Sequence, residues 1–306
     1  MRHRYITADV FTDRPLGGNP LAVFPDARGL SPERMQQIAR ELNLSETVFV
    51  LPPEDPSHTR RLRIFTPGTE LPFAGHPTVG TAHILAALGE VPSGDGATRI
   101  VFEEGVGPVE VTVRAEAGVP VFAQLAVARL PETRPLEHSL ADLADLLSLD
   151  SSDLLDGEDR PEPWSCGVAF LYIPVRDRSA LARARLRPDL WERMLAGSWA
   201  PHVYVLCRDP EQPGSDLRVR MFAPAMGIAE DPATGAAAAA LGGWVAARSP
   251  ERDGTLRQVI EQGYEMGRPS ILHLEVDRRD GAITAVRVGG STVLMGEGWM
   301  ELPEQE

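Results

Sequence analysis

The sequence predicts an α/β protein built from two copies of one module. The first observation is an internal repeat: the segment Arg61–Pro67, RLRIFTP, matches Arg218–Pro224, RVRMFAP. The second is that each segment is followed by a loop containing glycine and proline and then by a helix of small apolar residues, predicted at Thr78–Leu88 and Thr234–Ala247. A helix that is apolar nearly all round belongs inside a domain.

The third observation is a similar Glu-x-Gly segment after each helix, at a point where a pair of strands is predicted. Glu103–Gly105 provides it in the first half and Glu261–Gly263 in the second. Coincidence in a chain rich in proline and glycine is the alternative, but three matched features in one order favour duplication. The register at the helix starts stays open, because Pro77 aligns with Pro232 in one version and Gly75 with Gly235 in the other.

The first half reads as a series of strands around two helices. Ser31 is a good helix cap and Pro32 a good first helical residue, so a helix is predicted from there to about Leu42. Alternating or β-branched apolar residues predict the strands. These are expected at residues 5–11, 21–24, 47–51, 61–65, 99–103, 108–114 and 120–127.

Residues 130–163 differ in composition from both halves. They are rich in Pro, Asp, Glu and Ser and contain one amphipathic helix near 139–147, so we expect them to connect the halves. The second half then resumes with strands near 168–175 and 202–207. The predicted domains are 1–128, possibly completed by the C-terminal strand, and 129–306.

Composition narrows the class of protein. Hydrophobic residues make up 43% and charged residues 24%, ordinary values for a globular protein, and the formal net charge is −14. So acidic a chain, without a cluster of Lys and Arg, is not expected to bind nucleic acid. We expect no secretory signal and no membrane span, since neither a short apolar signal core nor a run of about 18 apolar residues is present. Two cysteines, Cys166 and Cys207, cannot form a disulfide framework, which favours the cytoplasm.

The two helix starts are candidate anion sites. Each start offers free backbone N–H groups and the positive end of a helix dipole, so two starts facing each other would suit a carboxylate. Gly75 and Gly235 would let the substrate approach the backbone closely. The alternative is that these glycines serve only tight turns.

Three titratable residues stand near these starts. His76 precedes Pro77, the expected first helical residue, and an imidazole changes charge near neutral pH; a capping or packing histidine is the alternative. Asp231 is a candidate acid or base and also an ordinary helix cap. Glu46 lies between a helix and an apolar strand, where a lone glutamate is usually solvated.

Familiar cofactor and metal motifs are absent from the sequence. No phosphate-binding G-x-x-x-x-G-K-[ST], dinucleotide-binding G-x-G-x-x-G after a strand, or nucleophile elbow G-x-S-x-G occurs. Neither H-E-x-x-H nor C-x-x-C occurs, so no metal site is expected.

Five motifs in the same order resemble the phenazine-biosynthesis PhzF-like isomerase family. They are GGNPLAV at 17–23, NLSETVFV at 43–50, ELPFAGHPT at 70–78, EDPATG at 230–235 and QGYEMGRPS at 262–270. They cover most of the chain. The resemblance implies an α+β fold related to diaminopimelate epimerase: two pseudo-symmetric domains, each a curved mixed sheet wrapped around a central apolar helix. It also implies an active site in the cleft between the halves, no cofactor and a homodimer.

The resemblance also implies roles for particular residues. Glu46 matches the family's acid/base, which moves a proton between carbons, and His76 and Asp231 match its other catalytic residues. The implied substrate-binding residues are Asn19, Gly75, Gly235 and Ala236. Ala236 departs from the serine common in the family, which leaves the substrate more open than the reaction class.

In the related epimerases two thiols at the helix starts exchange the proton. Ala74 and Thr234 occupy those places here, which disfavours a two-thiol racemase. The predicted function is therefore a proton-shifting isomerase acting on a small carboxylate. The alternatives are an epimerase or dehydratase using the same site, and a carboxylate-binding protein without turnover; the presence of Glu46 argues against the last.

Overall fold

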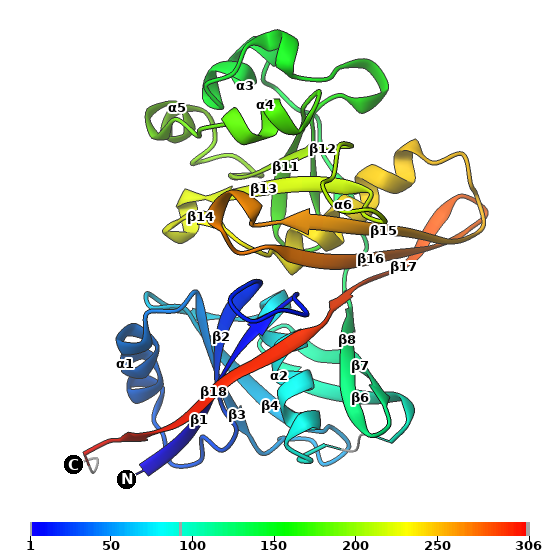
Figure 1. Ribbon diagram of the computed structural model, residues 1–306. Helices are drawn as coiled ribbons and strands as arrows, with labels where there is room; N and C mark the ends of the chain where they lie inside the picture. The colour runs from blue at the N-terminus through cyan, green and yellow to red at the C-terminus, as the bar shows by residue number, and fades with distance from the viewer. Residues whose placement is uncertain (1, 92–93, 304–306) are drawn as a thin grey trace. The chain divides into compact units, whose positions relative to one another are not determined.

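The computed structural model describes residues 2–91 and 94–303, which form two compact units (Figure 1). Within these residues, unit 1 comprises 2–126 and 289–303, and unit 2 comprises 127–288. Each unit contains a mixed sheet with a buried helix on one face. No helix within the described ranges is both long and apolar enough to cross a membrane.

The first strand in the pairing order of the unit 1 sheet is β18, the last strand of the chain. Strand β18 pairs antiparallel with β1, as Figure 1 shows, and β2, β3, β4, β6, β7 and β8 follow in order of pairing. The pairs β2–β3 and β4–β6 are parallel, and short β5 pairs with β4. The bounds are β1 Arg2–Val10, β2 Asn19–Phe24, β3 Glu46–Leu51, β4 Arg60–Phe65, β5 Glu70–Leu71, β6 Gly96–Glu104, β7 Gly107–Glu116, β8 Val119–Ala126 and β18 Thr292–Glu301.

Two helices cover opposite faces of this sheet. Helix α1, Pro32–Leu42, starts with the predicted Ser31 cap and packs against Phe49 of β3 and its aromatic neighbours. Helix α2, Gly75–Ala87, contacts β1, β2, β3, β7 and β8 and is buried from Gly75 to Ala86. Because side chains alternate along a strand, β3 sends Phe49 toward α1, and Glu46 and Val48 toward α2.

Unit 2 repeats this plan. Its pairing order is β9, β10, β11, β12, β13, β15 and β16, with short β14 paired to β13. The strands are β9 Glu132–Thr133, β10 Glu162–Ser165, β11 Ala169–Pro174, β12 His202–Cys207, β13 Leu217–Ala223, β14 Ile228–Asp231, β15 Gly254–Gln262, β16 Ser270–Arg279 and β17 Ala282–Gly290. The helices are α3 Leu140–Leu146, α4 Arg178–Arg183, α5 Pro188–Met194 and α6 Gly235–Arg248, with 3₁₀ turns at Ser151–Asp153, Gly157–Asp159, Pro224–Met226 and Tyr264–Met266.

The strand pairings confirm the internal repeat. The series β2–β3–β4–β6 is parallel, antiparallel, parallel, and so is β11–β12–β13–β15. In both units a short antiparallel strand leads directly into the buried helix. The predicted fold class is confirmed: two modules of one plan, each with a mixed sheet around a central apolar helix.

The helix starts settle the register of the repeat. Helices α2 and α6 begin at Gly75 and Gly235. A Cβ on Gly105 would lie 2.7 Å from Pro72 Cα, and one on Gly263 would lie 2.6 Å from Pro232 O. Pro72 is therefore the counterpart of Pro232, and the alignment of Pro77 with Pro232 is wrong. Helix α2 begins three residues before the predicted Thr78.

Hydrogen bonds and ion pairs at equivalent positions also recur in the two units. In each unit the glutamate that begins the segment Glu-x-Gly (Glu103–Gly105 or Glu261–Gly263) accepts hydrogen bonds from two successive backbone N–H groups. An arginine of the repeated strand, β4 or β13, also forms an ion pair with a glutamate. The acceptors are Glu103, from Glu54 and Asp55, and Glu261, from Glu211 and Gln212; the ion pairs are Arg61–Glu54 and Arg218–Glu211. These contacts hold the start of the repeated strand to the end of the strand beyond the helix.

Residues 130–163, which were expected to connect the halves, also contribute to a core of unit 2. Leu143, Ala144 and Leu146 of α3 are buried in one core with Ile173 and Val205 of the sheet. The segment's polar residues cover its outer side, while leucines at helical spacing bury the inner side. This segment belongs to the second unit's own core.

Candidate functional site

Glu46 and His76 lie together in unit 1. Glu46 Oε2 is 3.3 Å from His76 Nε2. Relative exposure is 8% for Glu46 and 5% for His76. The alternative of a solvated glutamate is therefore wrong, because β3 begins at Glu46 and directs its side chain to the face covered by α2.

His76 does not cap its helix. It is the second residue of α2, whose N-cap is Ala74, with no side-chain capping bond. Burial lowers the pKa of His76 to about 3, since the charged imidazolium loses its hydration. The imidazole is thus neutral at pH 7, and the contact joins a carboxyl group to a neutral ring; it is not an ion pair.

Glu104 is a second buried carboxyl group near the start of α2, and it was not among the predicted site residues. Its Oε1 lies 2.7 Å from Thr78 Oγ1, which is 2.8 Å from Ala74 O. Burial raises the pKa of Glu104 to about 8. The protonated carboxyl can donate to the Thr78 hydroxyl, which then donates to Ala74 O, so one chain of hydrogen bonds fixes the residue before Gly75.

Asp231 is held in a network in unit 2. It is the last residue of β14 and is 6% exposed. Thr234 Oγ1 donates to Asp231 Oδ2 at 2.5 Å. The amide of Gln262 donates to Thr234 Oγ1 at 2.9 Å and to Asp231 O at 2.7 Å, and it accepts from Thr234 N at 3.1 Å. Asp231 is not the cap of α6, since Thr234 takes that position.

Gln262 and Glu104 are counterparts in the two units. Each directly precedes the glycine that packs on the loop proline, Gly263 or Gly105, and each bonds to a threonine at a helix start. The sequence motif contains Gln262 but does not reveal this contact. Aligning the segment Glu103–Gly105 with Glu261–Gly263, residue by residue, would have identified both residues.

A row of side chains crosses the sheet of unit 2 beside Asp231. In register, Tyr172 lies opposite Tyr204, Tyr204 opposite Met221, and Met221 opposite Asp231. Tyr172 OH donates to Ala237 O of α6 at 2.7 Å. Burial, together with the charge of Asp231, raises the pKa of Tyr204 far above its usual range. This face of the sheet therefore carries polar groups under the first turn of α6.

The remaining predicted residues take up positions at these element starts. Asn19 is the first residue of β2 and is fully buried. Gly75 begins α2 in unit 1, whereas Gly235 and Ala236 are the first two residues of α6 in unit 2. Unit 1 thus brings together Glu46 and His76 near the start of α2, and unit 2 places Asp231 near the start of α6.

Sequence comparison assigns the family. The profile described as "Phenazine biosynthesis-like protein" matches residues 8–298. The chain belongs to this family.

Relatives of this phenazine biosynthesis-like protein are named isomerases. An uncharacterized isomerase of Mesorhizobium japonicum is 43% identical over 96% of this chain and 97% of its own length. The trans-2,3-dihydro-3-hydroxyanthranilate isomerase of Pseudomonas aeruginosa is 36% identical over 97% of this chain and 98% of its own. The chain is accordingly an enzyme, a PhzF-type isomerase.

A solved structure shares the fold. The PhzF-family protein of Bacillus anthracis superposes with a TM-score of 0.89, at 24% sequence identity, over 99% of this chain and 100% of that one. At this identity the likeness supports the architecture described above.

This PhzF-type isomerase has no thiol at either helix start, where Ala74 and Thr234 stand. Cys166 follows β10 and Cys207 ends β12. Burial raises the pKa of Cys166 to about 12 and that of Cys207 to about 11, so neither is a ready thiolate. The side-chain groups of the described residues include no cluster of three or more His, Cys, Asp or Glu suited to a metal.

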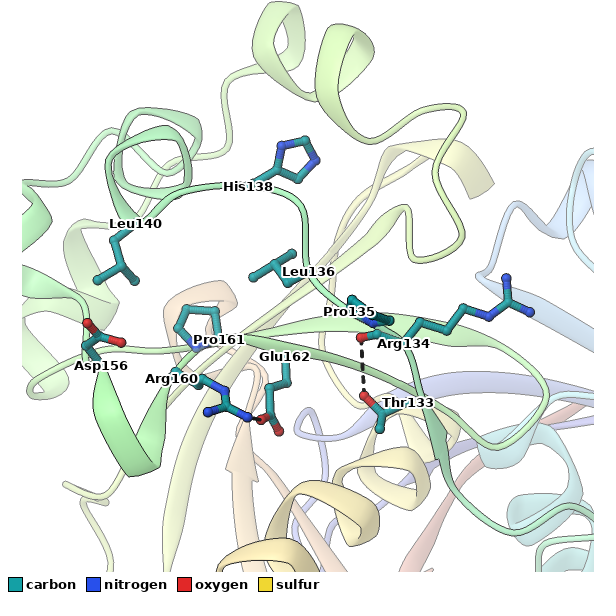
Figure 2. A pocket seen from close by; sticks show the side chains of 10 residues that line it. All are labelled: Thr133, Arg134, Pro135, Leu136, His138, Leu140, Asp156, Arg160, Pro161 and Glu162. Atoms are coloured by element: carbon teal, nitrogen blue, oxygen red, sulfur yellow. Dashed lines mark hydrogen bonds and ion pairs between the residues drawn. The ribbon is translucent and has the colours of Figure 1, made fainter.

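A pocket of about 510 Å³ lies in unit 2 of this PhzF-type isomerase (Figure 2). Segment 133–138 forms one wall, and Arg160 and Glu162, paired at 3.0 Å, form another. Its lining includes none of the predicted site residues. This pocket is therefore separate from the residues that the sequence predicted for the site.

Proposed function

We propose that this isomerase moves a proton between two carbons of a small carboxylate substrate, with Glu46 as the acid/base and without a cofactor. The observation that carries the proposal is the buried contact of Glu46 with neutral His76, 3.3 Å apart. A carboxylate screened from water is a stronger base toward a substrate than one in bulk solvent. A neutral imidazole beside it can hydrogen bond without adding charge.

In this proposal the proton makes one round trip. The Glu46 carboxylate removes a proton from one carbon, and the electron pair left behind delocalises through the substrate. The protonated carboxyl then returns the proton to a different carbon. No electrons enter or leave, so the reaction needs neither an oxidant nor a reductant. Asp231, which accepts from Thr234, is proposed to bind a polar group of the substrate.

The substrate carboxylate is proposed to bind at the helix starts. Gly75 and Gly235 begin two buried helices, and the residues that flank these starts include no Lys or Arg. Backbone N–H groups and the helix dipoles would therefore stabilise the anion. This part of the proposal takes the two units as the predicted domains and places the active site in a cleft between them, with Asn19, Gly75, Gly235 and Ala236 lining it.

The first compound to test is trans-2,3-dihydro-3-hydroxyanthranilate, which the name of the Pseudomonas aeruginosa relative contains. We further propose that the enzyme is a cytoplasmic homodimer that binds neither nucleic acid nor membranes. Sedimentation of the purified chain tests the dimer.

The substitution Glu46→Gln tests the acid/base assignment. It keeps the size of the side chain but removes the basic carboxylate, so turnover should fall by about 10²–10⁴-fold while substrate affinity changes little. Steady-state kinetics and calorimetric binding measure the two effects. Glu104→Gln is the matched control, since it makes the same change at another buried carboxyl of unit 1 and should keep most of the activity.

The same measurements separate the alternatives. Product with inverted or racemised configuration and no shifted double bond would indicate an epimerase, and loss of water would indicate a dehydratase. Tight binding of carboxylates without turnover by the unsubstituted chain would indicate a binding protein. Full activity of Glu46→Gln would contradict the proposed mechanism.

A further inference from the structure

The internal repeat gives Glu46 a counterpart in unit 2. Glu46 begins β3 and lies opposite Leu21 of the parallel neighbour β2; His202 begins β12 and lies opposite Phe170 of the parallel neighbour β11. The antiparallel pairings give the same alignment. Thr47 pairs with Phe65, and Val203 pairs with Phe222, which is the residue equivalent to Phe65 in the repeat. His202 therefore occupies in unit 2 the place that Glu46 occupies in unit 1.

The side chain of His202 lies on the face of the sheet that α6 covers. Val203 and Val205 belong to the core formed with α3, α4 and α5, on the other face. Alternation along the strand turns His202 and Tyr204 to the opposite side, where Tyr172 bonds to Ala237 in the first turn of α6. This is the side on which Asp231 ends β14.

His202 is buried and incompletely satisfied. It is 6% exposed, and its Nδ1 makes no hydrogen bond within the described part of the chain. Its ring packs 5.5 Å from that of Phe170. A buried ring nitrogen without a hydrogen bond is costly, and a bound ligand or water at the start of α6 would satisfy it. Burial also lowers the pKa of His202 to about 4, so the ring is neutral at pH 7.

The second residue of the buried helix differs between the units: it is His76 in α2 and Ala236 in α6. Gly75–His76 aligns with Gly235–Ala236, so where unit 1 sets an imidazole against Glu46, unit 2 offers only a methyl group. The imidazole of unit 2 therefore comes from the strand and not from the helix. Each unit presents one imidazole near its helix start.

We infer that His202 contacts the substrate at the start of α6, with its neutral imidazole forming a hydrogen bond to the anionic group. This inference rests on the proposed function, which brings the substrate to that helix start. It adds a side-chain ligand to a site otherwise built from backbone N–H groups and Asp231.

Substitution of two histidines tests the inference. His202→Gln should lower kcat/KM for trans-2,3-dihydro-3-hydroxyanthranilate by about 10–100-fold, the loss expected for one buried hydrogen bond to a charged group. His83→Gln is the matched control: His83 is also buried, with its pKa lowered by burial to about 4, but it lies in the middle of α2. The control should retain its activity. Thermal unfolding of both variants shows whether any loss comes from folding.

A second measurement does not depend on turnover. In full-length enzyme with ¹⁵N-labelled histidine, anthranilate should shift the ring signals of both His76 and His202, and His202→Gln should weaken its binding at least fivefold. A shift of His76 without one of His202, or wild-type kcat/KM in a folded His202→Gln variant, overturns this inference alone. Absence of any shift at either ring overturns the proposed carboxylate site together with it.

Discussion

At the scale of single residues, the contacts of Thr234 fix the direction of its hydroxyl proton. Gln262 Nε2 can only donate, so it donates to Thr234 Oγ1 at 2.9 Å. The single hydroxyl proton is then directed to Asp231 Oδ2. The assigned orientation of the Gln262 amide agrees, because its Oε1 accepts from Thr234 N. Asp231 is thereby held in one rotamer by a donor that is itself fixed.

Thr234→Val should separate this positioning role from a structural one. Valine keeps the shape and removes the donor to a carboxylate, so kcat should fall by about 10-fold or more, while Thr234→Ser, which restores the hydroxyl, should come within about threefold of wild type. Steady-state kinetics at one pH measure the series, with thermal unfolding as the control for stability. Equal activities of the valine and serine variants would show that the hydroxyl does not position Asp231.

The sequence predicted the identity of these residues better than their surroundings. Glu46, His76 and Asp231 were chosen as candidates because they stand in motifs. Whether Glu46 is solvated depends on where β3 begins and on which face α2 covers, and no local pattern carries that information. His202 lies outside the motifs, and only alignment of the strand starts in the two halves reveals it.

At the scale of helices and strands, helix boundaries could be predicted where capping residues mark them in the sequence. Helix α1 begins as expected because Ser31 and Pro32 are strong start signals. Helix α2 starts earlier than expected because no side chain caps it. Its start is fixed by tertiary contacts, through Glu104, Thr78 and the packing of Gly105 on Pro72. The amphipathic helix predicted near 139–147 is present as α3, but the polar composition of residues 130–163 did not indicate that it packs into the core of unit 2.

The buried carboxyl of Glu104 should make stability depend on pH. Its folded pKa of about 8 exceeds the usual value of 4.5, so the folded chain holds a proton that the unfolded chain releases between these pH values. Stability should therefore decline as pH rises from 4.5 to 8 and then level off, by an amount on the order of a few kcal/mol.

Glu104→Gln should remove this decline, because glutamine does not titrate and already occupies the counterpart position in unit 2, Gln262. Urea unfolding at pH 6 and pH 9 measures the difference. As pH falls from about 6.5 toward 4, the variant should lose stability, because burial lowers the folded pKa of His76 to about 3 and of His83 to about 4 and only their unfolded forms take up protons there. In the wild-type protein the rising contribution of Glu104 should oppose part of this loss. A decline above pH 6 that is unchanged in the variant would exclude Glu104 as its source.

At the scale of the whole molecule, the proposed mechanism predicts how isotopes are distributed. Glu46 is only 8% exposed, so a proton that it removes from the substrate should exchange slowly with solvent. Turnover in deuterated water should therefore give less than one deuterium per product molecule at the accepting carbon. Mass spectrometry measures it, with product incubated with enzyme as the control for later exchange. Complete incorporation with racemised product would favour the epimerase alternative.

The matched halves also indicate the order in which features arose. We infer that contacts present in both, such as the paired backbone bonds to Glu103 and to Glu261, were inherited from a single-module ancestor, because they occupy equivalent positions in the two units. On this inference, positions at which the halves disagree changed after the module was duplicated. Glu46 and His202 form one such pair, and His76 and Ala236 another. Specialisation of this lineage is therefore recorded in the asymmetries between its halves, and ancestral reconstruction should begin there.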